Sequence, residues 1–217
     1  MPEAKTSRVF LLSPANISGV RGRLILREEA KSSLALRLRE AGESLGEIFS
    51  FISGLYFRGK LAYARAFAAP PAAVPGILII TASHGLVTPD SNMTLDDLRT
   101  MSKVPIDARE SRYRVPLERD AGGLSQRIGD TCEVILLGSI ATPKYVEPLL
   151  HIFGNRLSFP LEFVGRGDMS RGGLMLRSAR ENVQLTYAPL VESQRHGPKP
   201  ARLPRVSTSS SHDRPRK

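Results

Sequence analysis

The run Ile77-Leu78-Ile79-Ile80-Thr81 leads directly into the polar loop Ala82-Ser83-His84-Gly85 and is the clearest strand signal in the sequence. A short continuous apolar run of this kind suits a strand that is buried on both faces. Similar runs occur at Val9–Leu12 and Glu133–Leu137, and each is also followed by small polar residues. A last strand is predicted at residues 158–164. The sequence therefore predicts several strands that each end in a polar loop.

Helical segments are predicted between these strands. Arg23–Ala41 carries spaced leucines and ends at a glycine, and the alanine-rich segment Leu61–Ala69 stops at two prolines. For Ile48–Ile52 the sequence does not distinguish a strand from a buried turn, because a short apolar run does not define a period. Three further helices are predicted. They are 94–101, with Thr94 and Asp97 as a capping arrangement, 117–128, and 144–153, with Thr142 as N-cap and Pro143 in the first helical position.

Strands that alternate with helices indicate an α/β protein with a mainly parallel or mixed central sheet covered by helices. With 217 residues, of which 41% are hydrophobic, the chain can bury one sizeable core. We therefore expect a single compact domain over residues 1–187. The remaining residues, 188–217, contain seven basic and two acidic side chains and few apolar ones, so they are expected to form a disordered basic tail. That tail is either a solvated terminus or a non-specific electrostatic arm.

Several protein classes are disfavoured by composition. No apolar run approaches the ~20 residues that span a bilayer, and the N-terminus lacks the apolar region of a signal peptide, so a cytoplasmic protein without a membrane partner is expected. The single cysteine, Cys132, precludes an internal disulfide, and four scattered histidines show no metal-ligand spacing. No structural metal is predicted. The dinucleotide and P-loop fingerprints are missing, and no cofactor is predicted.

The segment Val164–Leu176 packs Arg166, Asp168 and Arg171 among four glycines. Glycine permits close approach to a ligand and arginine presents a fork of donors, so this segment is suited to an anion. The alternative is a turn and a helix start in which Asp168 or Ser170 is the N-cap.

Ligands of parallel α/β sheets bind outside the carboxyl ends of the strands, so the polar loops are expected to share one cleft. His84 and Asp168 are the candidate catalytic residues, although a lone histidine is more often structural. Tyr56 and Phe57 near the basic candidates are as readily core residues. The candidates for binding nucleic acid or another anion are Ser13, Asn16, Arg21, Arg58, Lys60, Ser83, Ser139, Lys144, Arg166 and Arg171.

Five segments follow one another in a recognisable order. They are Leu12-Ser13-Pro14-Ala15, residues 51–59, Ser83-His84-Gly85-Leu86-Val87 with Pro89, Leu137-Gly138-Ser139 with Lys144-Tyr145, and Arg166-Gly167-Asp168-Met169-Ser170-Arg171. In this order they resemble the YaaA-type proteins of the peroxide stress response. The likeness spans roughly residues 9–176, and it also extends to smaller bacterial domains of unknown function. The sequence differs from the family before Arg166, where a lysine-rich segment is replaced by Glu162-Phe163-Val164-Gly165.

The resemblance implies a compact α/β protein that binds DNA and helps to limit oxidative damage. The net charge of +10 also favours a polyanionic partner. We therefore expect a nucleic-acid-binding protein, with duplex DNA as the first partner to consider. The alternative is an enzyme that cleaves or exchanges the glycosidic bond of a nucleobase or nucleoside, for which Asp168 and His84 would supply the polar groups.

Overall fold

A computed structural model describes residues 6–141, 143–191, 197 and 200. Six strands form one mixed sheet in the order β4-β3-β1-β6-β7-β8, and two short strands form a separate antiparallel pair. The strands of the main sheet are β1 (Arg8–Leu12), β3 (Ile77–Ile80), β4 (Leu86–Val87), β6 (Glu133–Leu137), β7 (Leu157–Pro160) and β8 (Tyr187–Pro189). The pair consists of β2 (Glu43–Ser44) and β5 (Asn92–Met93). The predicted mixed sheet in an α/β domain is confirmed.

The centre of the sheet is built from three of the predicted apolar runs. β1 lies parallel to β3 on one side and to β6 on the other, with Leu12 opposite both Ile79 and Leu137. The side chains of β1 from Val9 to Leu12 are fully buried, because helices cover both faces of these parallel strands. Because Leu12, Ile79 and Leu137 lie side by side near the ends of three parallel strands, the loops that follow these strands lie at the same edge of the sheet.

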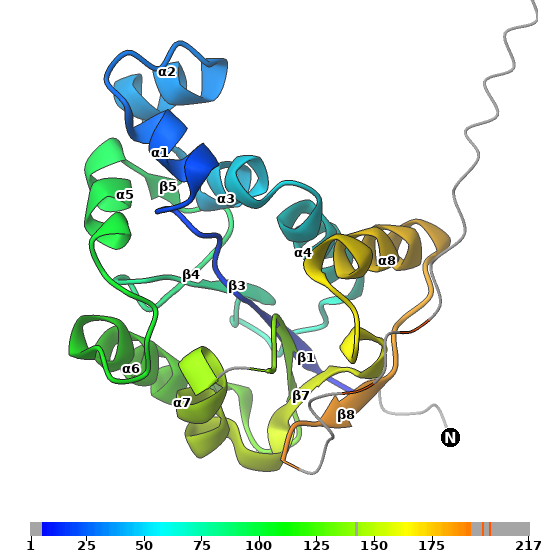
Figure 1. Cartoon of the computed structure of the whole chain (residues 1–217). Helices are drawn as coiled ribbons and strands as arrows, with labels where there is room; N and C mark the ends of the chain where they lie inside the picture. The colour runs from blue at the N-terminus through cyan, green and yellow to red at the C-terminus, as the bar shows by residue number, and fades with distance from the viewer. Residues whose placement is uncertain (1–5, 142, 192–196, 198–199, 201–217) are drawn as a thin grey trace, which may run out of the picture.

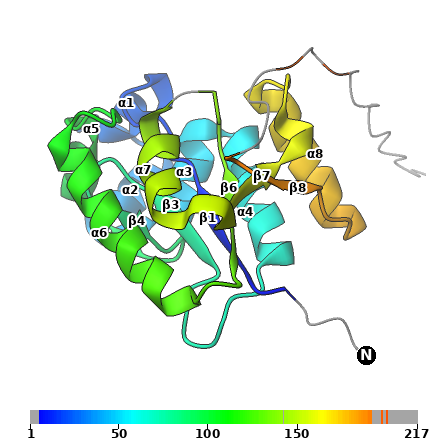
Figure 2. The same cartoon turned by 90° about the horizontal axis from the view of Figure 1, so that it is seen from below.

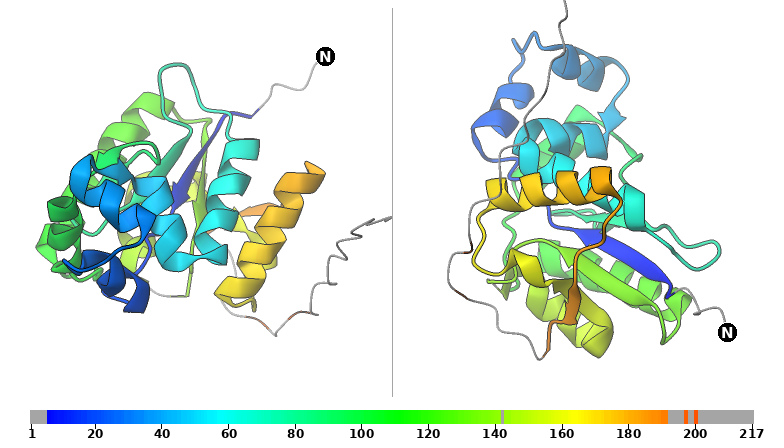
Figure 3. Two further views of the ribbon diagram at one scale, coloured as in Figure 1. Left: turned by 90° about the horizontal axis from the view of Figure 1, so that it is seen from above. Right: turned by 90° about the vertical axis from the view of Figure 1, so that its right-hand side faces the viewer.

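Helices form a layer on each face. The right-hand view of Figure 3 shows α4 and α8 above the sheet and α7 below it, and Figure 2 shows α6 beside α7. The end of the molecule that carries α1, α2 and α5 lies at the carboxyl edge of the central strands (Figure 1). The helices are α1 (Val20–Leu26), α2 (Ser33–Glu40), α3 (Leu45–Ser53), α4 (Leu55–Phe67), α5 (Leu95–Ser102), α6 (Ser111–Ile128), α7 (Pro143–Phe153) and α8 (Asp168–Glu181).

Several predicted boundaries are wrong. The predicted helix 23–41 is two helices, because the chain breaks after Leu26 and restarts at the N-cap Ser32, whose hydroxyl accepts the Ala35 N–H. Residues 48–52 belong to helix α3, so both predicted alternatives, a strand and a buried turn, are wrong. The helices predicted at 61–69 and 117–128 begin six residues earlier, at Leu55 and Ser111.

The predicted last strand also ends early. β7 stops at Pro160, whose ring removes a ladder donor, and a 3-10 turn from Leu161 to Phe163 replaces the remaining strand. The following strand β8 returns antiparallel to β7, so the sheet extends two residues past position 187. The predicted N-cap Thr142 and most of the predicted tail lie outside the described residues.

Candidate functional site

The centre of the sheet contains a reversal of strand order. From β1 the chain passes through α1–α4 to β3 on one side, and from β3 it returns through α5 and α6 to β6 on the other side. The connections that leave the carboxyl ends of β1 and β6 therefore diverge. A crevice forms where neighbouring connections diverge, and ligands of open α/β sheets bind there. The loops that begin at Ser13 and Gly138 meet at this point.

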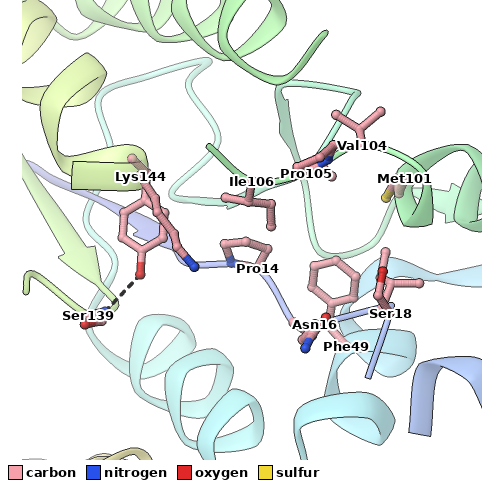
Figure 4. Close-up of a pocket in the computed structure, with 14 residues that line it drawn as sticks. Pro14, Asn16, Ser18, Phe49, Met101, Val104, Pro105, Ile106, Ser139 and Lys144 are labelled. Atoms are coloured by element: carbon pink, nitrogen blue, oxygen red, sulfur yellow. Dashed lines mark hydrogen bonds between the residues drawn. The ribbon is translucent and has the colours of Figure 1, made fainter. Parts of the chain in front are cut away.

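A cleft of about 460 Å³ opens at this reversal. Figure 4 shows Lys144 and Ser139 at one end of the cleft and Asn16, Ser18 and Met101 at the other. Loops that follow three strands contribute to it, as the sequence predicts for β1, β3 and β6. The lining residues are Pro14, Ala15, Asn16, Ile17, Ser18, Phe49, Ala82, Met101, Val104, Pro105, Ile106, Ser139, Lys144 and Tyr145.

The cleft has an apolar wall and polar ends. The wall is formed by Phe49, Met101, Val104, Pro105 and Ile106. At the polar ends, Asn16 supplies an amide and Lys144 an ammonium group. Lys144 is exposed in the first turn of α7, where the helix dipole also favours an anion. Such a combination holds a flat apolar group beside a negatively charged one. Of the predicted binding residues, Asn16, Ser139 and Lys144 line this cleft.

Tyr145 connects the cleft to the sheet beneath it. Its side chain is buried, and its hydroxyl accepts the Ser139 N–H at 3.1 Å. A Cβ on Gly138 would lie 3.0 Å from Ser13 Oγ and 3.2 Å from the Tyr145 hydroxyl, so only glycine leaves room for both oxygens. Burial raises the pKa of Tyr145, and hydrogen bonding to Ser13 and Ser139 opposes that effect.

Lys60 lies deeper than an anion-binding surface residue would. Its side chain is fully buried, and Nζ donates to the Ser13 carbonyl at 2.5 Å and to Ser13 Oγ at 3.0 Å. The ammonium group also lies over the rings of Tyr56 and Phe57, 4.6 and 4.7 Å from their centroids. Loss of hydration lowers the pKa of Lys60 to about 7, although Asp168 opposes this shift. Lys60 and Ser13 therefore form a buried pair behind the cleft.

The predicted glycine-rich ligand loop at 164–176 is mostly helix. Gly167 is the N-cap and α8 starts at Asp168, which corresponds to the alternative of a turn and a helix start but with a different cap residue. Gly172 packs directly on α4, where a Cβ would meet the Leu55 carbonyl oxygen at 2.8 Å. Gly172 therefore allows α8 and α4 to approach each other closely.

The charged residues of that segment bond mainly to nearby protein groups. Arg171 is buried, donates to the Phe163 carbonyl from two nitrogens, and lies 3.7 Å from Asp168. Arg166 donates to the Ser170 hydroxyl at 3.3 Å. None of these residues lines the cleft. Arg171 and Asp168 nevertheless lie close enough to Tyr56 and Tyr145 to shift the pKa of both phenols.

His84 and Ser83 form a local cluster outside the cleft. The Ser83 hydroxyl lies 2.9 Å from His84 Nδ1, and His84 Nε2 lies 3.4 Å from the Asp97 carboxylate. His84 thus bridges the loop after β3 to α5, and neither it nor Asp168 lines the cleft. The remaining predicted residues, Arg21 and Arg58, are exposed on α1 and α4.

The sequence reasoning missed the wall of the cleft at Val104, Pro105 and Ile106. The only signal there is a short apolar run between a helix and a charged segment. In the part of the chain that the structure describes, no group of three or more His, Cys, Asp or Glu side chains is placed to hold a metal ion. No helix among those residues has the length and apolar character needed to cross a membrane.

Comparisons of the chain with models of protein families, with curated proteins and with solved structures found no match. The function is therefore argued from the geometry and chemistry of the cleft.

Proposed function

We propose that the chain binds nucleic acid and takes one unpaired nucleotide into the cleft at the strand-order reversal. The observation that carries this proposal is the opposition of an apolar wall to Lys144 and Asn16. The wall suits a nucleobase, the Asn16 amide suits its polar edge, and Lys144 suits a phosphate.

The size of the cleft favours an unpaired nucleotide over a duplex. A volume of about 460 Å³ falls within the range of sites for small ligands. A double helix would need a broad basic surface with an element that enters a groove. Proteins that bind single strands combine a basic path with apolar or aromatic surfaces for the bases. The cleft provides the second feature through the apolar side chains of Pro105 and Ile106, which are exposed and half-buried, respectively.

The net positive charge of the chain is consistent with a basic path for the strand. Lys and Arg number 31 against 21 Asp and Glu. Exposed Arg21 on α1 and exposed Arg58 on α4 extend the positive charge beyond the cleft. The resemblance to YaaA-type proteins also supports a nucleic-acid partner, and it is the basis for a link to oxidative stress.

The test measures the fluorescence anisotropy of labelled single-stranded and duplex oligonucleotides with the full chain at 50 and 200 mM salt. We expect tighter binding to the single strand and a marked loss of affinity at the higher salt concentration. Lys144→Gln should weaken binding about tenfold and Asn16→Ala about threefold, because one phosphate contact and one base contact are lost. The matched control is Lys31→Gln, which removes the same charge at an exposed position outside the cleft.

Two results would contradict the proposal. Equal losses in Lys144→Gln and Lys31→Gln would show that only overall charge matters. Equal affinity for duplex and single strand in all variants would show that the cleft does not accept an unpaired nucleotide.

A further inference from the structure

Directly behind the cleft, three side chains from different elements meet. Ser13 follows β1, Lys60 comes from α4 and Tyr145 from α7. Lys60 Nζ donates to Ser13 Oγ at 3.0 Å, and the Tyr145 hydroxyl lies close to the same serine, beside Gly138. Ser13 itself is buried, but its neighbour Pro14 and Tyr145 both line the cleft, so this cluster lies directly against the space assigned to the nucleotide.

The burial of Lys60 is costly for a purely structural residue. Lysine is almost never fully buried unless it is paired with an opposite charge. Among the described residues Lys60 forms no ion pair, and its bonds go to a carbonyl and a hydroxyl of one serine. Burial lowers the pKa of Lys60 to about 7, so much of the amine is neutral near pH 7. A neutral amine accepts a proton, and a hydroxyl at 3.0 Å can provide one.

The surrounding hydroxyls add to this arrangement. Tyr56 Oη is buried near Arg171, and the rings of Tyr56 and Phe57 lie beside the Lys60 amine. Burial also raises the pKa of Tyr56, as it does for Tyr145. Both phenols therefore keep their protons at neutral pH, and the Tyr145 hydroxyl lies between Ser13 and the Ser139 N–H at the edge of the cleft.

We infer that Ser13 is a nucleophile that Lys60 activates and that attacks a phosphoryl group seated in the cleft. The arrangement has the parts that such chemistry needs, which are a hydroxyl, a base within hydrogen-bond reach and a protonated phenol beside the same hydroxyl. The identity of the electrophile as a phosphodiester rests on the proposed function, because Lys144 and the start of α7 are assigned to the phosphate.

The proposed step balances without a further reactant. Neutral Lys60 takes the Ser13 hydroxyl proton while the Oγ–P bond forms and the P–O bond to the leaving strand breaks. Tyr145 donates its proton to the leaving oxygen and regains one from the Lys60 ammonium group. The products are a phosphoserine ester and a free hydroxyl. Water then attacks the ester by the reverse route and releases Ser13.

The first experiment treats the full chain with diisopropyl fluorophosphate at pH 8 and locates the adduct by intact mass and peptide mapping. We expect one adduct, on Ser13. Lys60→Gln should slow its formation at least 100-fold, since general-base catalysis contributes about 10² or more. Ser13→Ala should abolish it. The matched control is Ser111→Ala, which removes a serine hydroxyl at an exposed position outside the cleft and should leave the rate unchanged.

A second measurement covers the case in which Lys60→Gln fails to fold. In the unaltered chain, the labelling rate should rise about tenfold per pH unit below pH 7 and level off above it, because only the neutral form of Lys60 acts as a base. Asp168 raises the pKa of Lys60. Tyr56 and Tyr145 also lie in this cluster, and burial keeps both phenols protonated in this range. Arg171, which acts on both phenols, stays charged throughout. Absence of an adduct, an adduct elsewhere, or a rate independent of both Lys60 and pH would overturn the inference.

A third measurement separates this inference from the proposed function. A single-stranded oligonucleotide with a bridging phosphorothiolate loses a thiol that does not attack in return, so a covalent complex with Ser13 should survive a denaturing gel. If the fluorophosphate labels Ser13 but the chain does not bind the single strand, the proposed function is wrong and the assignment of Ser13 as a nucleophile is supported. Strand binding without either adduct would mean that the nucleophile is wrong.

Discussion

Replacing Lys60 with methionine tests whether the buried amine titrates in the folded chain. Methionine keeps a long unbranched side chain beside Tyr56 and removes the titrating group. Because burial lowers the Lys60 pKa from 10.5 to about 7, the folded chain binds this proton less tightly than the unfolded chain. Unfolding therefore takes up a proton between about pH 7 and 10.5, and the contribution of Lys60 to stability rises with pH in this window.

The size of the expected stability change follows from the uptake of one proton by Lys60 on unfolding. Each pH unit within the window changes the free energy of unfolding by about 1.4 kcal/mol, so the change from pH 7.5 to pH 9 is roughly 2 kcal/mol. Cys132 acts in the opposite direction, because burial raises its thiol pKa and its contribution falls as pH rises through the ordinary thiol range. The Cys132 contribution is common to both proteins and cancels in their difference.

The assay is urea denaturation of the original chain and of Lys60→Met at pH 7.5 and pH 9. We expect the stability of the original chain to gain roughly 2 kcal/mol relative to the variant over this interval. Tyr56 and Tyr145 do not contribute, since burial raises the pKa of both above the interval. Stability curves that stay parallel in the two proteins would refute a neutral buried Lys60 and remove the base from the proposed reaction.

Three stability measurements test other parts of the fold. Gly172→Ala should cost about 2 kcal/mol in urea denaturation because its Cβ meets the α4 backbone below 3 Å, whereas Gly173→Ala, with nothing within 4 Å, should be neutral or stabilise by up to ~1 kcal/mol. Tyr63→Phe should cost about 1 kcal/mol of stability because the Tyr63 hydroxyl accepts the Leu185 N–H. Tyr113→Phe should be neutral, because it removes a buried hydroxyl without a described partner. Equal losses in the two variants would contradict this. Thr94→Ala should lower the melting temperature through a loss of about 1 kcal/mol, since both bonds of its capping box are present, and an unchanged melting temperature would argue against it.

Apolar runs identified the centre of the sheet from sequence alone. β1, β3 and β6 follow directly from their continuous apolar character, because a strand covered on both faces needs no polar alternation. The capping pair Thr94 and Asp97 also located α5 correctly. Helix α3 was missed although Ser44 and Glu47 precede its apolar run with capping spacing, and the Ser44 hydroxyl does accept the Glu47 N–H.

The candidate site was predicted only in part. The edge of the sheet and the cleft residues Asn16, Ser139 and Lys144 follow from the position of loops after strands. The burial of Lys60 could not be foreseen, because it depends on α8 packing over α4. Gly172, next to Arg171, packs α8 against α4, and in sequence this role resembles that of a glycine in a ligand loop. Only the tertiary contact distinguishes the two roles.

The position of β1 has a consequence for how the chain folds. The first strand to be synthesised lies at the centre of the sheet, and Arg8 pairs with Glu133, 125 residues later. During synthesis one edge of β1 must therefore remain unpaired until β6 emerges. Such non-local pairing slows folding and leaves a hydrogen-bonding edge open to other chains. We expect slow refolding, and aggregation during refolding that increases with protein concentration.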